Sequence, residues 1–236
     1  NINLISDCNM LIHCAGVNRG ENVYNENVNL ATELIGALKK NNIKIDIKFI
    51  SSTQEDKNNP YGKSKLLASQ LLQSYCNKTS TNFESYKLPN LFGVFGKPNY
   101  NSFINTFCYN IVNNLEVNYN ENLVELCYVY DAIKVIDNQL PTFPITQIRV
   151  DEVYSLISTF HQQYSEGIIP KLENNFTRNL FNVYREFASP VHQNIRHTDD
   201  RGYLVELIKT FGTESQVFFS TTKPGITRGN HFHFGK

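Results

Sequence analysis

The feature that most constrains this chain is a serine pair, Ser51-Ser52, followed by the motif Asn59-Pro60-Tyr61-Gly62-Lys63-Ser64-Lys65. Tyr61 and Lys65 are four residues apart, so on a helix their side chains lie on one face, about one turn from each other. A free tyrosine titrates near pH ~10 and transfers protons poorly at neutral pH unless a nearby ammonium group stabilises its phenolate. Lys65 is placed to supply that ammonium group. Ser52 is placed to hydrogen-bond a ketone oxygen while a nicotinamide delivers hydride.

The residues around this motif distinguish it from a chance match. The Tyr-x-x-x-Lys pattern alone is weak, because Tyr130 and Lys134 repeat it elsewhere in the chain. The first motif, however, follows an apolar, β-branched run over 43–50, which is typical of a buried parallel strand. Asn59 is placed to cap a helix with Pro60 at its first position, which puts the tyrosine in the first turn. This context favours a short-chain dehydrogenase/reductase site over the alternative, a surface helix with an exposed Tyr and Lys.

The composition excludes several other classes of protein. The 236 residues carry 22 basic and 22 acidic side chains, and without a basic cluster they offer no electrostatic footprint for nucleic acid or an anionic membrane. No apolar run reaches the ~18 residues needed to span a bilayer, and no signal peptide opens the chain. The five cysteines are scattered without Cys-x-x-Cys pairs, at Cys8, Cys14, Cys76, Cys108 and Cys127. We expect reduced, mostly buried thiols in a cytoplasmic protein.

The chain before the serine pair has the pattern of an open α/β sheet. A short apolar strand is expected over 9–13, and a helix with an apolar stripe over 27–40. Ala15 and Gly16 follow that strand, where such sheets bind cofactors, although an ordinary strand-to-helix turn would look the same. No glycine-rich phosphate loop precedes them, and the first residue is not Met. We therefore expect roughly 50 residues of a dinucleotide-binding fold to be missing in front.

The same alternation continues after the serine pair. The expected elements are a helix from Pro60, a strand over 86–88, a helix over 103–112, a strand over 125–130 and a helix over 150–160. Pro89 and Asn90 can present groups to a nicotinamide and a substrate, or form a structural turn. The polar loop over 97–102 can cover a substrate or simply precede a helix. Asp131 is expected to cap the helix that follows the strand over 125–130.

The last part of the chain has a different pattern. The βα alternation is lost between 166 and 190, and the short strands with Gly and Pro turns that follow indicate an all-β module. We expect a reductase domain over 1–188 and the start of a second domain over 189–236. His231 and His233 are two residues apart, so on a strand both imidazoles point to the same side. They are either part of a metal site or histidines that contact a substrate or the solvent. Two histidines alone leave a zinc site incomplete, because zinc usually takes three or four protein ligands.

A series of long motifs extends over nearly the whole chain. In order they are His13-x-Ala15-Gly16-Val17-Asn18-Arg19, Ser51-Ser52-Thr53-Gln54, Asn59-Pro60-Tyr61-Gly62-Lys63-Ser64-Lys65, Pro89-Asn90-Leu91-Phe92-Gly93, Lys97-Pro98-Asn99-Tyr100-Asn101-Ser102, Asp199-Asp200-Arg201-Gly202 and Lys223-Pro224-Gly225-Ile226-Thr227-Arg228-Gly229-Asn230-His231-x-His233. In this order the motifs resemble the bifunctional capsular polysaccharide enzymes of the CapF type. Those enzymes join an extended short-chain dehydrogenase/reductase to a cupin. The resemblance implies an α/β fold with a Rossmann-like parallel sheet, followed by the start of an all-β cupin module.

The resemblance also implies an activity on a UDP-linked 2-acetamido-2,6-dideoxy-4-hexulose. The cupin would epimerise carbon 3, and the reductase would then deliver hydride from NADPH to carbon 4. Tyr61 would be the proton donor, Lys65 its electrostatic partner and a contact to the nicotinamide ribose, and Ser52 the hydroxyl that orients the ketone. The other implied roles are cofactor contacts by Ala15, Gly16, Lys65 and Pro89, substrate contacts by Arg19, Asn90, Asn99 and Tyr100, and zinc ligation by His231 and His233. A homodimer is expected, because both component folds commonly pair.

The chain departs from the family pattern in three places. The glycine-rich cofactor loop is absent, and so are the later cupin strands with the remaining metal ligands, so we expect the chain to be part of a longer protein. The nine-residue step from Ser52 to Tyr61 leaves open whether Ser51, Ser52 or Thr53 faces the substrate. Two alternative functions stay open. One is the reduction of another nucleotide-linked 4-keto-6-deoxy sugar of the rhamnose type, and the other is a non-catalytic nucleotide-sugar-binding scaffold.

Overall fold

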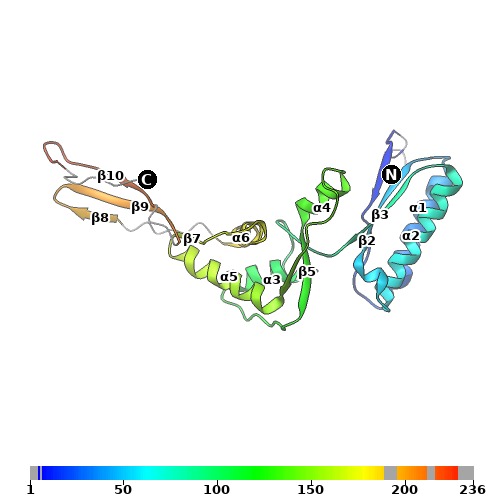
Figure 1. Ribbon diagram of the computed structural model, residues 1–236, viewed down its shortest axis with the longest axis horizontal. Helices are drawn as coiled ribbons and strands as arrows, with labels where there is room; N and C mark the ends of the chain where they lie inside the picture. The colour runs from blue at the N-terminus through cyan, green and yellow to red at the C-terminus, as the bar shows by residue number, and fades with distance from the viewer. Residues whose placement is uncertain (1–4, 6, 189–195, 212–215, 228–236) are drawn as a thin grey trace. The chain divides into compact units, whose positions relative to one another are not determined.

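The chain divides into two compact units. The computed structural model describes residues 5, 7–188, 196–211 and 216–227. The first unit is made of 1–92 and 124–147, and the second of 93–123 and 148–236. Parallel strands joined by helices in the first unit confirm the expected α/β class, and short strands at the end of the second confirm a β region (Figure 1). The expected domain boundary at 188/189 adjoins residues outside the described part and stays a prediction.

A three-stranded parallel sheet with the order β1-β2-β3 organises the first unit. Its elements are β1 (Met10–His13), α1 (Val23–Lys40), β2 (Asp46–Ser52), the 3-10 turn η2 (Thr53–Asp56), α2 (Pro60–Thr79) and β3 (Phe83–Leu88). Because parallel strands run in the same direction, their carboxyl ends meet at one edge of the sheet. The serine pair therefore lies at the same edge as the loops that follow β1 and β3.

One buried cluster fixes helices α1 and α2 against the sheet. Apolar residues recur on α1 at a helical period, and the alternate residues Ile47 and Phe49 of β2 point to the same layer. The buried members of the cluster are Ala31, Ile35, Leu38, Ile45, Ile47, Phe49, Ala68, Leu72, Tyr75 and Cys76. Their packing determines where the start of α2, with its tyrosine and lysine, meets the end of β2.

Tyr75 is the polar member of this cluster. It is 3% exposed, and its hydroxyl donates a hydrogen bond to the carbonyl oxygen of Ile43 at 2.6 Å. In Tyr75→Phe the partly buried carbonyl of Ile43 loses this donor, and we expect the free energy of unfolding to fall by about 1 kcal/mol. Denaturant titration measures the change. The matched variant Tyr24→Phe, on the exposed side of α1, should stay within about 0.5 kcal/mol of the wild type; equal losses in both would show that the Tyr75 hydrogen bond is not the cause.

The ends of the early elements differ from the expected ones in an informative way. Helix α1 begins at Val23, four residues before the expected start at 27. Strand β2 runs from Asp46 to Ser52 and so includes both serines, which were expected to follow it. The reason is pairing, because β3 continues alongside β2 and Ser51 and Ser52 lie in register with Lys87 and Leu88.

A second sheet follows β3. It contains β4 (Asn90–Phe92), β5 (Leu123–Tyr128) and β6 (Thr146–Arg149), and α4 (Val129–Ile136) follows β5. The expectation that Asp131 caps this helix is wrong. The N-cap residue is Tyr128, without a side-chain cap bond, and Asp131 lies in the first turn and forms an ion pair with Lys134 at 3.2 Å. Helix α4 starts three residues earlier than the polar signal suggested, because the apolar residues Val129 and Tyr130 already belong to its first turn.

The described part of the second unit combines three helices with a small sheet. Its elements are α3 (Phe103–Val112), α5 (Val150–Ser165), β7 (Ile168–Ile169), α6 (Asn175–Phe187), β8 (Arg196–Asp199), β9 (Gly202–Thr210) and β10 (Gln216–Ser220). The sheet order is β10-β9-β7, and β8 pairs with β9. Helix α6 was not expected from the sequence. A capping box between Asn174 and Thr177 starts it, and the buried residues Leu180, Val183 and Tyr184 form its inner face.

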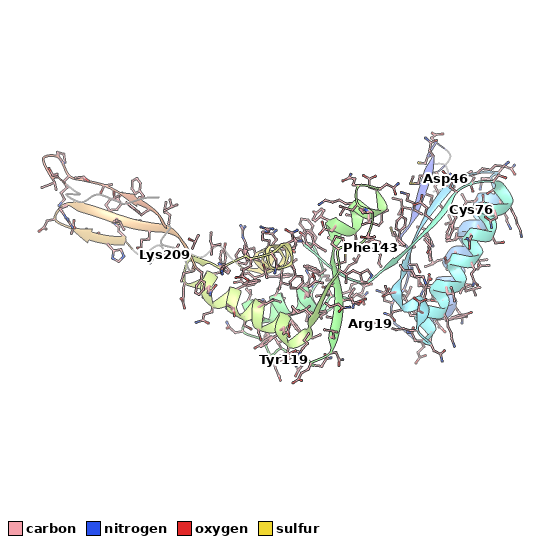
Figure 2. The ribbon with its side chains drawn as sticks, in the orientation of Figure 1. Arg19, Asp46, Cys76, Tyr119, Phe143 and Lys209 are labelled. Atoms are coloured by element: carbon pink, nitrogen blue, oxygen red, sulfur yellow. The ribbon has the colours of Figure 1, made fainter. Side chains whose placement is uncertain are left out.

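The cysteines agree with the sequence-based expectation. Cys76, Cys108 and Cys127 are buried, Cys8 and Cys14 are exposed, and none of the five forms a disulfide (Cys76 lies on α2 in Figure 2). Over the described ranges, no helix combines the length and the apolar character that crossing a membrane requires.

Candidate active site

The predicted catalytic residues lie at the carboxyl edge of the first sheet. Ser52 is the last residue of β2, and Gly16 lies in the loop after β1. Turn η2 leads from the serine pair to α2, whose first turn contains Tyr61. Lys65 follows one helical turn later. Strand β2 and the helix that follows it thus place the three candidate catalytic side chains near one edge of the sheet.

The start of α2 is fixed by its cap. The Asn59 side chain accepts a hydrogen bond from Gly62 N at 2.8 Å and donates one to Gln54 Oε1 at 3.3 Å. Pro60 occupies the first helical turn, as expected. The second of these bonds links the cap to turn η2. The orientation of Tyr61 is therefore tied to the turn that follows Ser52.

The two serines have different surroundings. Ser51 is buried, and its hydroxyl donates a hydrogen bond to the Glu55 carboxylate. Ser52 is half-buried and accepts a hydrogen bond from Gln54 N at 3.2 Å, and its side chain acts on the Tyr61 phenol, whose pKa it lowers. Between the two serines, the geometry therefore favours Ser52 as the hydroxyl that meets a substrate beside Tyr61.

Tyr61 has the protonation state of a proton donor. Burial raises the pKa of its phenol, and the Ser52 side chain acts in the opposite direction. Since a free tyrosine already titrates near pH ~10, this phenol keeps its proton at neutral pH. A group that must deliver a proton to a developing alkoxide needs that starting state.

Lys65 is one of the few buried cations of the described part. It is 4% exposed, its ammonium donates a hydrogen bond to the Ile50 carbonyl oxygen at 2.8 Å, and it lies 4.7 Å from the centre of the Phe49 ring. Burial lowers the pKa of Lys65, while the nearby Cys14 and Glu55 raise it. The ammonium group is thus held at the end of β2, and its expected role as partner of the Tyr61 phenol remains a prediction.

The loop after β1 approaches Lys65 closely. A Cβ atom placed on Gly16 would lie 3.2 Å from Lys65 Nζ and 3.3 Å from Asn27 Oδ1, so a larger residue there would crowd the ammonium group. The backbone at Gly16 is exposed. Because Gly16 has no side chain, a ligand can approach its backbone beside the buried ammonium group. This suits a nicotinamide ribose, which needs a cation for its hydroxyls and space against the backbone. The residues at this edge therefore fit the nicotinamide half of the expected cofactor.

Asn27 is a site residue that sequence reasoning missed. It is 3% exposed, and its amide bonds Val17 in both directions, accepting from N at 2.8 Å and donating to O at 2.9 Å. It also donates to Ser64 Oγ at 3.1 Å. Asn27 thus fixes the loop after β1 to the helix of Tyr61 and Lys65. The available signal was its place on the apolar stripe with Ala31 and Ile35, where a polar residue needs partners.

His13 was likewise not singled out. It is buried at the end of β1, and its ring stacks on Phe49 with the centres 5.6 Å apart. Burial, with a smaller contribution from Lys65, lowers the pKa of His13, so the imidazole is neutral at neutral pH. It adds no second positive charge beside Lys65.

The remaining predicted site residues are placed as follows. Ala15 and Arg19 are exposed in the loop between β1 and α1, Pro89 is buried directly after β3, and Asn90 is exposed at the start of β4 (Arg19 is labelled in Figure 2). Asn99 and Tyr100 belong to the second unit and are exposed there. The backbone of Asn99 is left-handed (φ 58°), and its N–H donates to Thr106 Oγ1 at 2.9 Å. His231 and His233 lie outside the described residues.

A family model matches more than half of the chain. Residues 2–143 match the NAD dependent epimerase/dehydratase family. The chain belongs to this family. Residues 197–236 match a second model, the polysaccharide biosynthesis C-terminal domain. The α/β fold with a Rossmann-like NAD(P)-binding sheet and the short β region after it thus agree with the family assignment.

Two relatives extend over nearly the whole chain. A UDP-2-acetamido-2,6-beta-L-arabino-hexul-4-ose reductase from Pseudomonas aeruginosa is 32% identical, and the match covers 99% of this chain and 67% of that protein. The crystal structure of the capsular polysaccharide assembling protein CapF from Staphylococcus aureus is 33% identical with a TM-score of 0.82, covering 98% of this chain and 68% of that one. The chain is therefore a CapF-like member of the family, and it spans about two thirds of the length of these relatives.

More distant structures show the fold alone. The UDP-glucuronic acid 4-epimerase from Bacillus cereus in complex with NAD is 14% identical with a TM-score of 0.64, and it covers 78% of this chain and 76% of its own. Within the ranges that the structure describes, no group of three or more His, Cys, Asp or Glu side chains is placed to hold a metal ion. The zinc expectation thus concerns residues outside those ranges.

Proposed function

We propose that this CapF-like chain reduces the C4 ketone of a UDP-linked 2-acetamido-2,6-dideoxy-4-hexulose with NADPH. The observation that carries the proposal is the pairing of Ser52 with a protonated Tyr61, with the buried Lys65 one helical turn further on. This set performs carbonyl reduction and has no evident purpose in a scaffold. The exposed backbone at Gly16 beside Lys65 supports a nicotinamide at the same edge.

The residues of the chain divide the proton chemistry between them. NADPH, when bound, supplies the hydride that forms the new C–H bond at carbon 4. Ser52 hydrogen-bonds the ketone oxygen and holds it beside the Tyr61 hydroxyl. Tyr61 gives its proton to that oxygen as negative charge develops on it, which completes the alcohol. Lys65 stabilises the phenolate that remains and hydrogen-bonds the nicotinamide ribose.

The substrate class rests on similarity. The Pseudomonas aeruginosa relative is named for a UDP-2-acetamido-hexul-4-ose, and its match covers 99% of this chain. Arg19, Asn90, Asn99 and Tyr100 are the residues that we propose for contacts to the sugar nucleotide. Ala15, Gly16 and Pro89 are proposed for contacts to the cofactor.

We further propose that the β region begins a cupin domain that inverts carbon 3 of the same sugar. The match of residues 197–236 to the polysaccharide biosynthesis C-terminal domain supports this. An acidic C–H next to the C4 ketone makes the epimerisation chemically compatible with a substrate that is still unreduced. His231 and His233 would be two of the zinc ligands, and a homodimer stays the expected assembly.

The intact protein with NADPH and the UDP-linked 4-keto sugar tests the proposal. We expect NADPH absorbance to fall with this substrate and to stay constant with UDP-N-acetylglucosamine, which has a hydroxyl group instead of the C4 ketone. A 4-keto-6-deoxy sugar nucleotide without the 2-acetamido group tests the rhamnose-type alternative. If NADPH is oxidised faster with that sugar than with the 2-acetamido sugar, the substrate assignment is overturned. Constant absorbance with every ketone would favour a scaffold.

The product of the same reaction reports on the second activity. Proton NMR coupling constants give the configuration at carbon 3 of the reduced sugar. We expect inversion at carbon 3. A chelator that removes zinc should abolish this inversion, while NADPH oxidation with a pre-epimerised substrate continues. Retention of the original configuration would limit the protein to reduction.

A further inference from the structure

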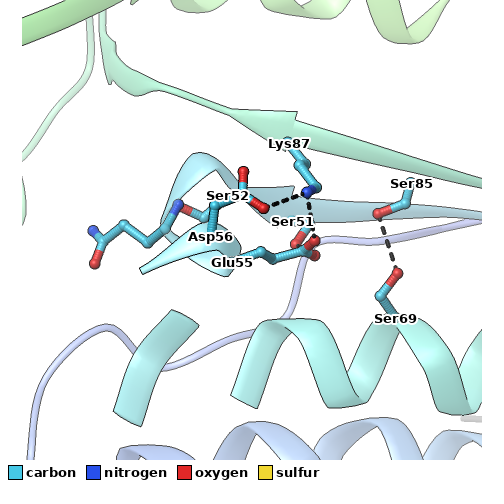
Figure 3. A network of polar contacts seen from close by, with 8 residues as sticks. Ser51, Ser52, Glu55, Asp56, Ser69, Ser85 and Lys87 are labelled. Carbon is cyan, nitrogen blue, oxygen red and sulfur yellow. Dashed lines mark hydrogen bonds and ion pairs between the residues drawn. The ribbon is translucent and has the colours of Figure 1, made fainter. Parts of the chain in front are cut away.

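A buried carboxylate lies directly behind the serine pair and is not used by the mechanism above. Glu55 belongs to η2, and its side chain is 3% exposed. It accepts the hydrogen bond of the Ser51 hydroxyl and lies 3.4 Å from Lys87 Nζ. Figure 3 shows Lys87 reaching from β3 towards this carboxylate and towards that of Asp56, which is 2.9 Å away. The register of the sheet explains the arrangement, because Lys87 lies beside Ser51 on the neighbouring strand.

Glu55 and Asp56 differ sharply although they share Lys87. The Asp56 side chain is 72% exposed, so its ion pair is screened by solvent and contributes little. The Glu55 carboxylate is removed from water, and a buried charge is costly unless partners compensate it. It has two such partners in Ser51 and Lys87, and it also acts electrostatically on Lys65. The Lys65 ammonium group binds the carbonyl oxygen of Ile50, next to the Ser51 that Glu55 holds. A buried charge that is hydrogen-bonded to the serine pair and acts electrostatically on this lysine calls for a functional explanation.

We propose that Glu55 is a positioning residue of the reductase centre, which turns Ser51 inward so that Ser52 meets Tyr61 and which keeps the Lys65 ammonium group charged. This inference rests on the proposed function and adds to it a residue that acts through Ser52 and Lys65. Glu55 is not placed to touch the substrate, since the Ser51 hydroxyl and Lys87 occupy its carboxylate.

The first part of the proposal follows from strand geometry. Consecutive residues of a strand point to opposite sides, so Ser51 and Ser52 cannot both face the same neighbour. The bond from Ser51 to Glu55 holds the first hydroxyl on the buried side. Glu55 is in turn anchored to β3 through Lys87. The second hydroxyl is thereby directed to the other side, where the Ser52 side chain acts on the Tyr61 phenol.

The second part follows from the charges around Lys65. The titratable groups that face Lys65 are His13 and Cys14 from the end of β1 and Glu55 from η2. His13 is neutral at neutral pH, as its burial requires, and Glu55 is the carboxylate of the set. The cations that act on Glu55 are Lys87, at 3.4 Å, and, electrostatically, Lys65. Removing the negative charge of Glu55 removes an interaction that favours the charged form of Lys65.

Three substitutions in the intact protein separate these effects. Glu55→Gln keeps the shape and an oxygen that accepts the Ser51 hydrogen bond, but removes the charge. Asp56→Asn removes a carboxylate from the same lysine at an exposed place outside the site. Ser51→Ala removes the hydrogen bond and leaves the Glu55 charge in place. Thermal unfolding of each variant shows that it is folded before activity is compared.

The pH dependence of the reductase rate is the first measurement. Reduction requires a charged Lys65 and a protonated Tyr61, so the rate falls on the alkaline side as either proton is lost. Loss of the Glu55 charge lowers the pKa of Lys65 further, so the alkaline limb in Glu55→Gln should move to lower pH, by about 0.5 unit. We expect Asp56→Asn to keep the wild-type profile, and Ser51→Ala to lower the rate about tenfold without moving the limb. An unmoved limb in Glu55→Gln would overturn the proposal.

A second measurement needs no substrate. Reductive ¹³C-methylation keeps the charge of lysine, and the Lys65 signal, assigned by its absence in Lys65→Arg, reports the titration of that group by NMR. Its midpoint should move to lower pH in Glu55→Gln and stay in place in Asp56→Asn. If this shift occurs while no ketone is reduced, the proposed function fails and the inference stands. If ketones are reduced and the midpoint does not move, the inference fails alone.

Discussion

Tyr61→Phe should lower the turnover of the ketone substrate by about 10³-fold while the protein remains folded. The substitution removes one hydroxyl group and keeps the ring, so the packing at the start of α2 is preserved. What is lost is the proton that would neutralise the developing alkoxide, and general acids contribute about 10²- to 10⁴-fold to such reactions. Steady-state NADPH oxidation measures the loss. The Michaelis constant should change little, because the ketone retains its hydrogen bond with Ser52.

The chain offers a matched control for this variant. Tyr130 and Lys134 repeat the spacing of the motif on α4, but Tyr130 is 47% exposed and Lys134 forms an ion pair with Asp131. Tyr130→Phe should therefore leave turnover at the wild-type value. Full activity in Tyr61→Phe, or an equal loss in both variants, would mean that Tyr61 is not the proton donor.

These two motifs show what the sequence can and cannot establish. The spacing of Tyr and Lys is the same in both, so spacing alone does not identify a site. The flanking residues do, because Asn59 and Pro60 set the start of α2 and the structure has the expected cap bond. Helix α3 was predicted with both ends correct, at 103 and 112, because Ser102 caps a short apolar run.

The failures have two physical causes. Asp131 looked like a cap, but a helix can begin on apolar residues when the preceding strand leads straight into it. Glu55 and Asn27 were missed because their role depends on partners that are distant in the sequence, Lys87 for the first and Ser64 for the second. Local patterns do not contain these pairs. The register of β2 on β3 and the packing of α1 on α2 create them.

Ser51 and Ser52 show the same limit within the site itself. The two residues have identical side chains, and the sequence left open whether Ser51, Ser52 or the following Thr53 faces a substrate. The structure separates them by a partner that it supplies, the Glu55 carboxylate behind Ser51. The candidate catalytic set was thus predictable to the level of a motif, but the contact that distinguishes the two serines, from Ser51 to the buried Glu55 carboxylate, was not.

Gly62→Ala replaces one hydrogen atom by a methyl group, and it should lower the free energy of unfolding more than any comparable substitution in this site. A Cβ atom on Gly62 would lie 1.9 Å from the carbonyl oxygen of Gln54 and 3.1 Å from that of Lys57. Both are backbone atoms, so α2 and η2 would have to move apart. We expect the free energy of unfolding to fall by about 3 kcal/mol in denaturant titrations. Because η2 directly follows Ser52, turnover should also fall, by about tenfold or more.

Gly36→Ala is the control, and we expect it to raise the free energy of unfolding. Gly36 lies inside α1, and a Cβ atom there would meet no atom within 4 Å. Alanine is a better helix former than glycine, so the free energy of unfolding of this variant should rise by about 0.5–1 kcal/mol, and its activity should be unchanged. The two substitutions add the same methyl group to neighbouring helices. If they change the free energy of unfolding in opposite directions, the loss in Gly62→Ala is due to the contact between α2 and η2. Similar stability changes in both would show that α2 does not depend on this close approach, and that the link from Ser52 to Tyr61 is looser than the structure indicates.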